Sequence, residues 1–131
     1  MLYKMVICSI ILLSASCSSS HVDYNPPGDS SPNGKVGVIY KQEITIGAGL
    51  EDNPAFLTDK NASVNIYPSD IGLYVVTTNK RKDGLPIYNH IIITGVPLKS
   101  GEVKVSISGY TYGSMYTKTS RIDKTYSLEI K

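Results

Sequence analysis

Apolar and polar residues alternate strictly in two segments near the end of the chain. Between residues 103 and 108 the sequence reads VKVSIS, and between residues 126 and 130 it reads YSLEI. A period of two places successive side chains on opposite faces of a β-strand, so each segment predicts a strand with one face in a core and the other in water. A third segment, Ile91-Ile92-Ile93, is apolar on both faces and predicts a central strand.

The rest of the body of the chain also predicts short strands. No segment carries an apolar stripe of helical period over a useful length. Turn residues such as Asp83-Gly84 and Lys99-Ser100-Gly101 separate the strand-like segments about every ten residues. Residues 35–131 are therefore predicted to form one all-β domain, a single antiparallel β-sandwich of about seven strands. The predicted strands are 36–46, 62–67, 71–78, 87–94, 102–111, 115–119 and 122–130.

Several of these segments resemble a known family. The Gly95-x-Pro97 turn, a second glycine at Gly101 and the strand after it resemble the second half of the Ig-like, cadherin-like domains of bacterial surface proteins. The stretch VGVIYKQEITIGAG at residues 36–49 is similar to the first strand of those domains. The resemblance implies an Ig-like sandwich. Cadherin calcium sites need acidic motifs such as Asp-x-Asn-Asp, which the sequence lacks, so no metal or other cofactor is expected.

Residues 1–16 have the three parts of an export signal. Lys4 provides a positive start, residues 5–13 are apolar apart from Ser9, and small residues occupy positions 14–16. The apolar run is far shorter than the roughly 20 residues that cross a hydrocarbon core. A buried core helix is the weaker interpretation, because the Ser-rich stretch that follows does not continue an amphipathic pattern.

The end of this signal resembles the lipobox of bacterial lipoproteins. The sequence Leu-Leu-Ser-Ala-Ser precedes Cys17, although the large aliphatic residue Leu13 lies four positions before the cysteine rather than three. The resemblance implies that residues 1–16 form a lipoprotein signal peptide and that Cys17 becomes the lipidated first residue. It also implies attachment to the cell envelope, in the outer membrane of a Gram-negative bacterium. The alternative is an ordinary secretory signal that leaves Cys17 as a lone thiol.

Residues 17–34 have the composition of a linker. The stretch is rich in Ser, Pro, Gly and Asn and has almost nothing to bury. We predict a disordered tether that holds the domain on the order of 30 Å or more from the membrane. His21 lies in this stretch with Asp23 as its one candidate co-ligand, which argues against a metal site.

The charge of the processed chain argues against nucleic-acid binding. Loss of Lys4 with the signal leaves 12 basic residues against 11 acidic ones. Nucleic-acid binders use clustered basic residues, and the one basic run is Lys80-Arg81-Lys82, just before the Asp83-Gly84 turn. We interpret this run as a solvated loop tip. The alternative is a contact with an acidic glycan or a lipid head group.

The sequence offers little for catalysis. The predicted domain contains one histidine, His90, just before Ile91-Ile92-Ile93, and we interpret it as a strand residue that faces solvent or lies at the margin rather than as a general base. The chain has no nucleophile motif or phosphate-binding loop. The acidic residues of the domain fall mainly in turns, where Asp commonly bonds its own backbone. We therefore expect that the protein is not an enzyme, and a small hydrolase that uses turn carboxylates is the least favoured function. The acids concerned are Glu51, Asp52, Asp59, Asp70, Asp83 and Asp123.

The most unusual cluster is formed by Tyr110, Tyr112 and Tyr116. Tyrosine rings accept the C–H faces of sugars while their hydroxyls bond sugar hydroxyls, so the cluster is a candidate ligand site. Packing on a sandwich face is the alternative. We expect a lipid-anchored binding or interaction module of the cell envelope, whose ligand is a glycan or a partner envelope protein. A structural spacer lipoprotein is the alternative if the tyrosine face is covered.

Overall fold

The computed structural model describes residues 22–50, 53–112 and 119–131. These residues contain nine strands and no helix, and hence no helix long and apolar enough to cross a membrane. The strands are β1 (Asp23–Asn25), β2 (Tyr40–Gly47), β3 (Gly49–Leu50), β4 (Asn53–Pro54), β5 (Ala62–Tyr67), β6 (Leu73–Thr77), β7 (His90–Gly95), β8 (Gly101–Tyr110) and β9 (Arg121–Ile130).

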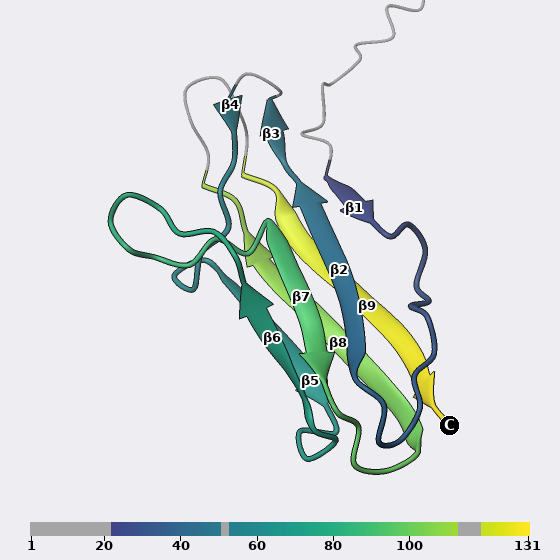
Figure 1. Ribbon diagram of the computed structural model, residues 1–131. Coiled ribbons are helices and arrows are strands. Elements are labelled where there is room, and N and C mark those ends of the chain that lie inside the picture. The colour runs from purple at the N-terminus through teal and green to yellow at the C-terminus, as the bar shows by residue number, and fades with distance from the viewer. Residues whose placement is uncertain (1–21, 51–52, 113–118) are drawn as a thin grey trace, which may run out of the picture.

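The two main sheets form an antiparallel β-sandwich, as the sequence predicted (Figure 1). One sheet has the order β1-β2-β7-β6 and the other has the order β5-β8-β9, while β3 and β4 form a separate two-stranded ribbon. Without the ribbon, the seven strands can be lettered A to G along the chain. The sheets then read A-B-E-D and C-F-G, which is the strand order of the constant-type immunoglobulin sandwich.

The core lies between the sheets and consists mainly of isoleucine and valine. The alternation predicted from the sequence is confirmed, because Val103, Val105 and Ile107 of β8 are buried while the residues between them face outward or lie at intermediate depth. On β9 the ring of Tyr126 is fully buried. β7 is a central strand of its sheet, as its unbroken apolar run predicted.

The predicted tether is wrong for residues 22–34, because this segment is part of the fold. β1 pairs with the edge of β2, with Tyr24 opposite Ile46. Further along, the amides of Ser31 and Gly34 donate to carbonyl oxygens of β9 at 3.0 and 2.9 Å. The segment thus crosses from one sheet to the other and covers an edge of each, which satisfies backbone groups that an open edge would leave to solvent. Residues 17–21 lie outside the described part of the chain.

Side chains of β9 also hold this N-terminal segment. The Tyr126 hydroxyl donates a hydrogen bond to the carbonyl oxygen of Pro26. The ammonium of Lys124 lies 5.4 Å from the ring centre of Tyr24 and 5.3 Å from that of Tyr126, and 3.2 Å from a carboxylate oxygen of Asp29. Composition did not reveal this attachment because a few side chains and backbone hydrogen bonds, rather than a hydrophobic run, provide it.

Three strands begin later than predicted, and β6 begins at Leu73 instead of Ile71. β2 begins at Tyr40 instead of Val36, because residues 35–38 form a turn in which the amide of Val38 donates to the carbonyl of Lys35. β7 begins at His90 instead of Ile87, because residues 79–87 close on themselves through the Ile87 amide and the Asn79 carbonyl. The predicted strand at 115–119 falls mostly outside the described residues.

Candidate functional site

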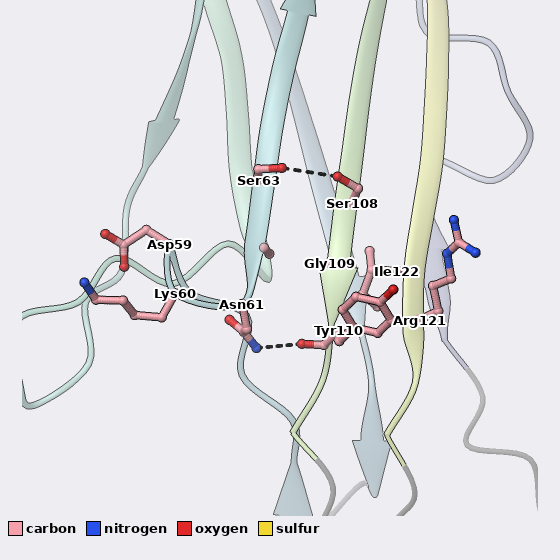
Figure 2. A pocket seen from close by; sticks show the side chains of 10 residues that line it. Asp59, Lys60, Asn61, Ser63, Ser108, Gly109, Tyr110, Arg121 and Ile122 are labelled. Carbon is pink, nitrogen blue, oxygen red and sulfur yellow. Dashed lines mark hydrogen bonds between the residues drawn. The ribbon is translucent and has the colours of Figure 1, made fainter.

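A shallow groove lies on the outer face of the three-stranded sheet, at the end where β8 stops (Figure 2). Its volume is about 500 Å³. The loop before β5 forms one side and β9 forms the other. In Figure 2, Lys60 and Arg121 stand on opposite sides of Tyr110, and Ser63 and Ser108 lie further along the two neighbouring strands. The lining residues are Asp59, Lys60, Asn61, Ala62, Ser63, Ser108, Gly109, Tyr110, Arg121 and Ile122.

Asn61 fixes the loop to the end of β8. Its side-chain amide donates to the carbonyl oxygen of Tyr110 at 2.8 Å, and its backbone carbonyl accepts from the Tyr110 amide at 2.9 Å. Its side-chain oxygen accepts from the amide of Thr58 at 2.7 Å. Because Asn61 joins the loop to the end of β8, the position of the Tyr110 backbone depends on this residue.

Gly109 allows the loop and the strand to approach closely. A Cβ at this position would lie 2.2 Å from the carbonyl oxygen of Asn61 and 2.7 Å from the Cα of Ala62. Its φ of 155° is also one that residues with a side chain rarely adopt. Glycine is therefore required where β8 passes the loop, next to Tyr110.

Tyr110 and Tyr112 both face outward, with exposed fractions of 58% and 64%. Thr111 between them is buried, and its hydroxyl oxygen accepts a hydrogen bond from the amide of Ser120 at 2.8 Å. The two tyrosines therefore share one face, as residues two positions apart in an extended chain do, and of the two only Tyr110 lines the groove. Tyr116, the third member of the predicted cluster, lies outside the described residues.

The groove offers polar groups of several kinds around the Tyr110 ring. The hydroxyls of Ser63 and Ser108 lie 3.2 Å apart and form a bridge across β5 and β8. Lys60 and Arg121 supply positive charge, and Asp59 supplies negative charge. Such a set, an exposed aromatic ring with hydroxyl, amide and charged groups near it, can hold a polar ligand that has apolar C–H faces.

The turn carboxylates considered for hydrolysis are distributed over the molecule. Asp70 contacts Lys99 at 2.9 Å, Asp83 contacts Arg81 at 3.4 Å and Asp123 contacts Arg121 at 3.6 Å. The hydrogen bond from Lys99 and its charge lower the pKa of Asp70. Glu51 and Asp52 lie outside the described residues. Among the residues described, no group of three or more His, Cys, Asp or Glu side chains is arranged to hold a metal ion.

His90 lies on the other sheet, away from the groove. Its Nδ1 is 3.2 Å from the hydroxyl oxygen of Thr78, and its Nε2 is 3.8 Å from a carboxylate oxygen of Glu43. Both neighbours are on the surface of the β1-β2-β7-β6 sheet, so His90 has partners typical of a strand residue at the margin of a fold.

A second cavity of about 520 Å³ lies beside the basic run. It is lined by Phe56, the three residues Lys80-Arg81-Lys82, Asp83 and Ile87. Phe56 is 49% exposed and precedes the buried Leu57. The sequence singled out the basic run but not Phe56, because no local pattern places residue 56 next to residues 80–82.

Comparisons of the chain with protein-family models, with curated proteins and with solved structures find no match. The resemblance to bacterial Ig-like domains therefore stays a prediction, and so does the lipid anchor at Cys17, which lies outside the described residues.

Proposed function

We propose that the protein is a lipid-anchored module of the cell envelope that binds a glycan in the groove at Tyr110. The observation that carries the proposal is the exposure of the Tyr110 ring at the wall of a groove that also presents Ser63, Ser108 and Arg121. The anchor at Cys17 rests on the lipobox-like sequence alone.

The chemistry of the groove suits a sugar better than an apolar ligand. A sugar ring places C–H groups against an aromatic face, while its hydroxyls bond the serines, Asp59 and the cations. A volume of about 500 Å³ is in the usual range for small-molecule sites. The groove is shallow and open, which suits one or two units of a longer chain rather than an enclosed free sugar.

The first experiment screens immobilised glycans and then titrates the purified protein by calorimetry, with chitotetraose as a neutral probe and tetragalacturonate as an acidic one. The variant is Y110A, and the matched control is Y74A, because Tyr74 is 57% exposed on the other sheet. Loss of one aromatic contact should weaken binding by roughly five- to tenfold. No binding to any glycan, or an equal loss in both variants, would contradict the proposal.

A partner envelope protein is the second candidate, since exposed tyrosines are also enriched at protein interfaces. Co-purification of the anchored protein from membranes, with Y110A and Y74A as the pair, tests this candidate. A spacer role is disfavoured by the exposure of Tyr110 and Tyr112, and a hydrolase role has no specific observation in its favour.

The anchor itself is tested separately, by mass spectrometry of the native protein. The expected N-terminal residue is Cys17 with acyl chains attached, and C17S should remain unprocessed. An unmodified thiol on a freely diffusing chain would remove the membrane from the proposed function while leaving the groove intact.

A further inference from the structure

The basic run and the beginning of the fold lie at the same end of the sandwich. β1 begins at Asp23, which pairs with Gly47 at the end of β2. β6 ends and β7 begins at this same end, where Thr77 lies opposite Ile91. The loop 79–87 between them therefore extends from the end at which the N-terminal chain enters, and the C-terminus lies at the opposite end (Figure 1).

This loop has a defined shape that presents its cations outward. The amide of Arg81 donates to the carbonyl of Leu85 at 2.8 Å, and the amide of Gly84 donates to the carbonyl of Arg81 at 2.9 Å. Lys80, Arg81 and Lys82 are all exposed. Arg81 contacts Asp83, while no described residue forms a salt bridge with either lysine.

An aromatic ring lies among these cations. Phe56 lines the same cavity as Lys80 and Lys82, and about half of its surface is exposed. Its backbone is held from two sides: its carbonyl accepts a hydrogen bond from Asn61 at 3.2 Å, and the side chain of Asn89 binds the backbone of the neighbouring residues. We call Phe56 and residues 80–82 the basic–aromatic end.

The length of the chain before β1 decides how far this end can lie from an anchor. Five residues lie between Cys17 and Asp23, which makes six steps along the chain, and an extended chain advances about 3.3 to 3.6 Å per step, so the span is at most about 22 Å. Residues 22–34 are bound to the sandwich and do not add to this reach. An acyl anchor at Cys17 therefore keeps the basic–aromatic end next to the bilayer.

We infer that the basic–aromatic end is a membrane-contact surface that binds anionic phospholipid head groups. Lys80, Arg81 and Lys82 contact the phosphates, and the Phe56 ring packs at the level of the head groups. The orientation rests on the proposed anchor at Cys17, whereas the head-group chemistry rests on the loop itself. The groove at Tyr110 is at the same end, so its ligand is expected close to the membrane surface.

The test uses residues 17–131 with C17S, which retain every described strand and core residue but carry no acyl chain and no signal. Cosedimentation is measured with vesicles of phosphatidylcholine alone and with one-third phosphatidylglycerol. We expect binding to the anionic vesicles that weakens as salt is raised, because salt screens exposed charges. The triple variant K80Q/R81Q/K82Q should lose roughly fivefold in partition coefficient per charge removed.

The matched control is K35Q/K99Q/K131Q, which removes the same charge from the opposite end of the sandwich. This control should keep most of the binding, and the partition coefficient of F56A should fall several-fold. Equal losses in the two triple variants, no preference for phosphatidylglycerol, or binding to tetragalacturonate in place of vesicles would overturn the inference. Because these proteins carry no lipid, the result is independent of whether the native Cys17 is acylated.

Discussion

The hydroxyl of Tyr126 donates a hydrogen bond of 2.6 Å to the carbonyl oxygen of Pro26, one hundred positions earlier in the chain. It joins the last strand to the segment that enters the fold. The ring is fully buried, and burial, with smaller contributions from Tyr24 and Asp29, raises the pKa of Tyr126. This contact helps to bind residues 22–34, which composition predicted as tether, to the sandwich.

The substitution Y126F should loosen the N-terminal segment without emptying the core. It keeps the ring but leaves the Pro26 carbonyl without this donor, so the free energy of unfolding should fall by about 1 to 2 kcal/mol. Hydrogen exchange should accelerate most at the amides of Ser31 and Gly34. Y67F is the control. Because Tyr67 is 75% exposed, the free energy of unfolding of Y67F should be close to that of the wild type. An equal acceleration of hydrogen exchange at amides throughout the sandwich of Y126F would contradict a local role for this bond.

The core strands were predictable because their alternation is local. β5 has the predicted bounds of 62–67, β8 is shifted by one residue toward the N-terminus, and β9 begins one residue earlier than predicted. The N-terminal segment was not predictable in this way, since β1 has only three residues and pairs mainly through its backbone. Its contacts with β9 come from residues about one hundred positions away, such as Tyr126, and no local pattern encodes them.

Asn89 is expected to be the most important polar side chain of the loops. Its side-chain oxygen accepts from the Leu57 amide at 2.8 Å, and its amide group donates to the carbonyls of Ile46 and Ala55, both at 3.0 Å. N89A leaves these backbone groups without partners and should lower the free energy of unfolding by about 2 to 4 kcal/mol.

Chemical denaturation of N89A, with N65A as an exposed strand control, measures this loss. Because Asn89 holds the segment that carries Phe56, N89A should also weaken vesicle binding. If the free energy of unfolding falls no more in N89A than in N65A, water replaces the three hydrogen bonds at little cost.

The candidate site was half predictable. Strand alternation and tyrosine chemistry pointed to Tyr110 and Tyr112, and both are exposed on one face. Asn61 and Gly109 were not recognised as site residues. Their roles depend on the contact between a loop and a strand nearly fifty residues away, which sequence spacing does not reveal.

The substitution G109A should distort the groove. The added Cβ would overlap the carbonyl oxygen of Asn61, and backbone atoms cannot move away as a flexible side chain can. A loss of at least about 2 kcal/mol in the free energy of unfolding is expected. G47A is the control, since its Cβ would meet nothing closer than 3.8 Å. G109A should also weaken glycan binding, and the double variant G109A/Y110A should bind more weakly than Y110A. A stability equal to that of G47A would contradict the close approach.

The last prediction concerns alkaline pH and Tyr40. This side chain is almost fully buried, its hydroxyl donates to the carbonyl of Pro32 at 2.7 Å, and the hydroxyl of Ser31 lies 2.8 Å away. Burial raises the pKa of Tyr40, and the hydrogen bond to Ser31 opposes this in part. The fold therefore prefers the neutral phenol.

The stability that follows from this preference is fully present below the unfolded pKa of about 10 and is lost as pH rises through the folded pKa. Between pH 9 and pH 11 the wild type should therefore lose more free energy of unfolding than Y40F, which has no phenol to ionise at this position. Each unit of difference in pKa corresponds to about 1.4 kcal/mol. Urea unfolding at a series of pH values measures the slopes, and Y67F, which changes an exposed phenol, should follow the wild type. Parallel slopes for the wild type and Y40F would mean that the buried phenol at the start of β2 is not what limits alkaline stability.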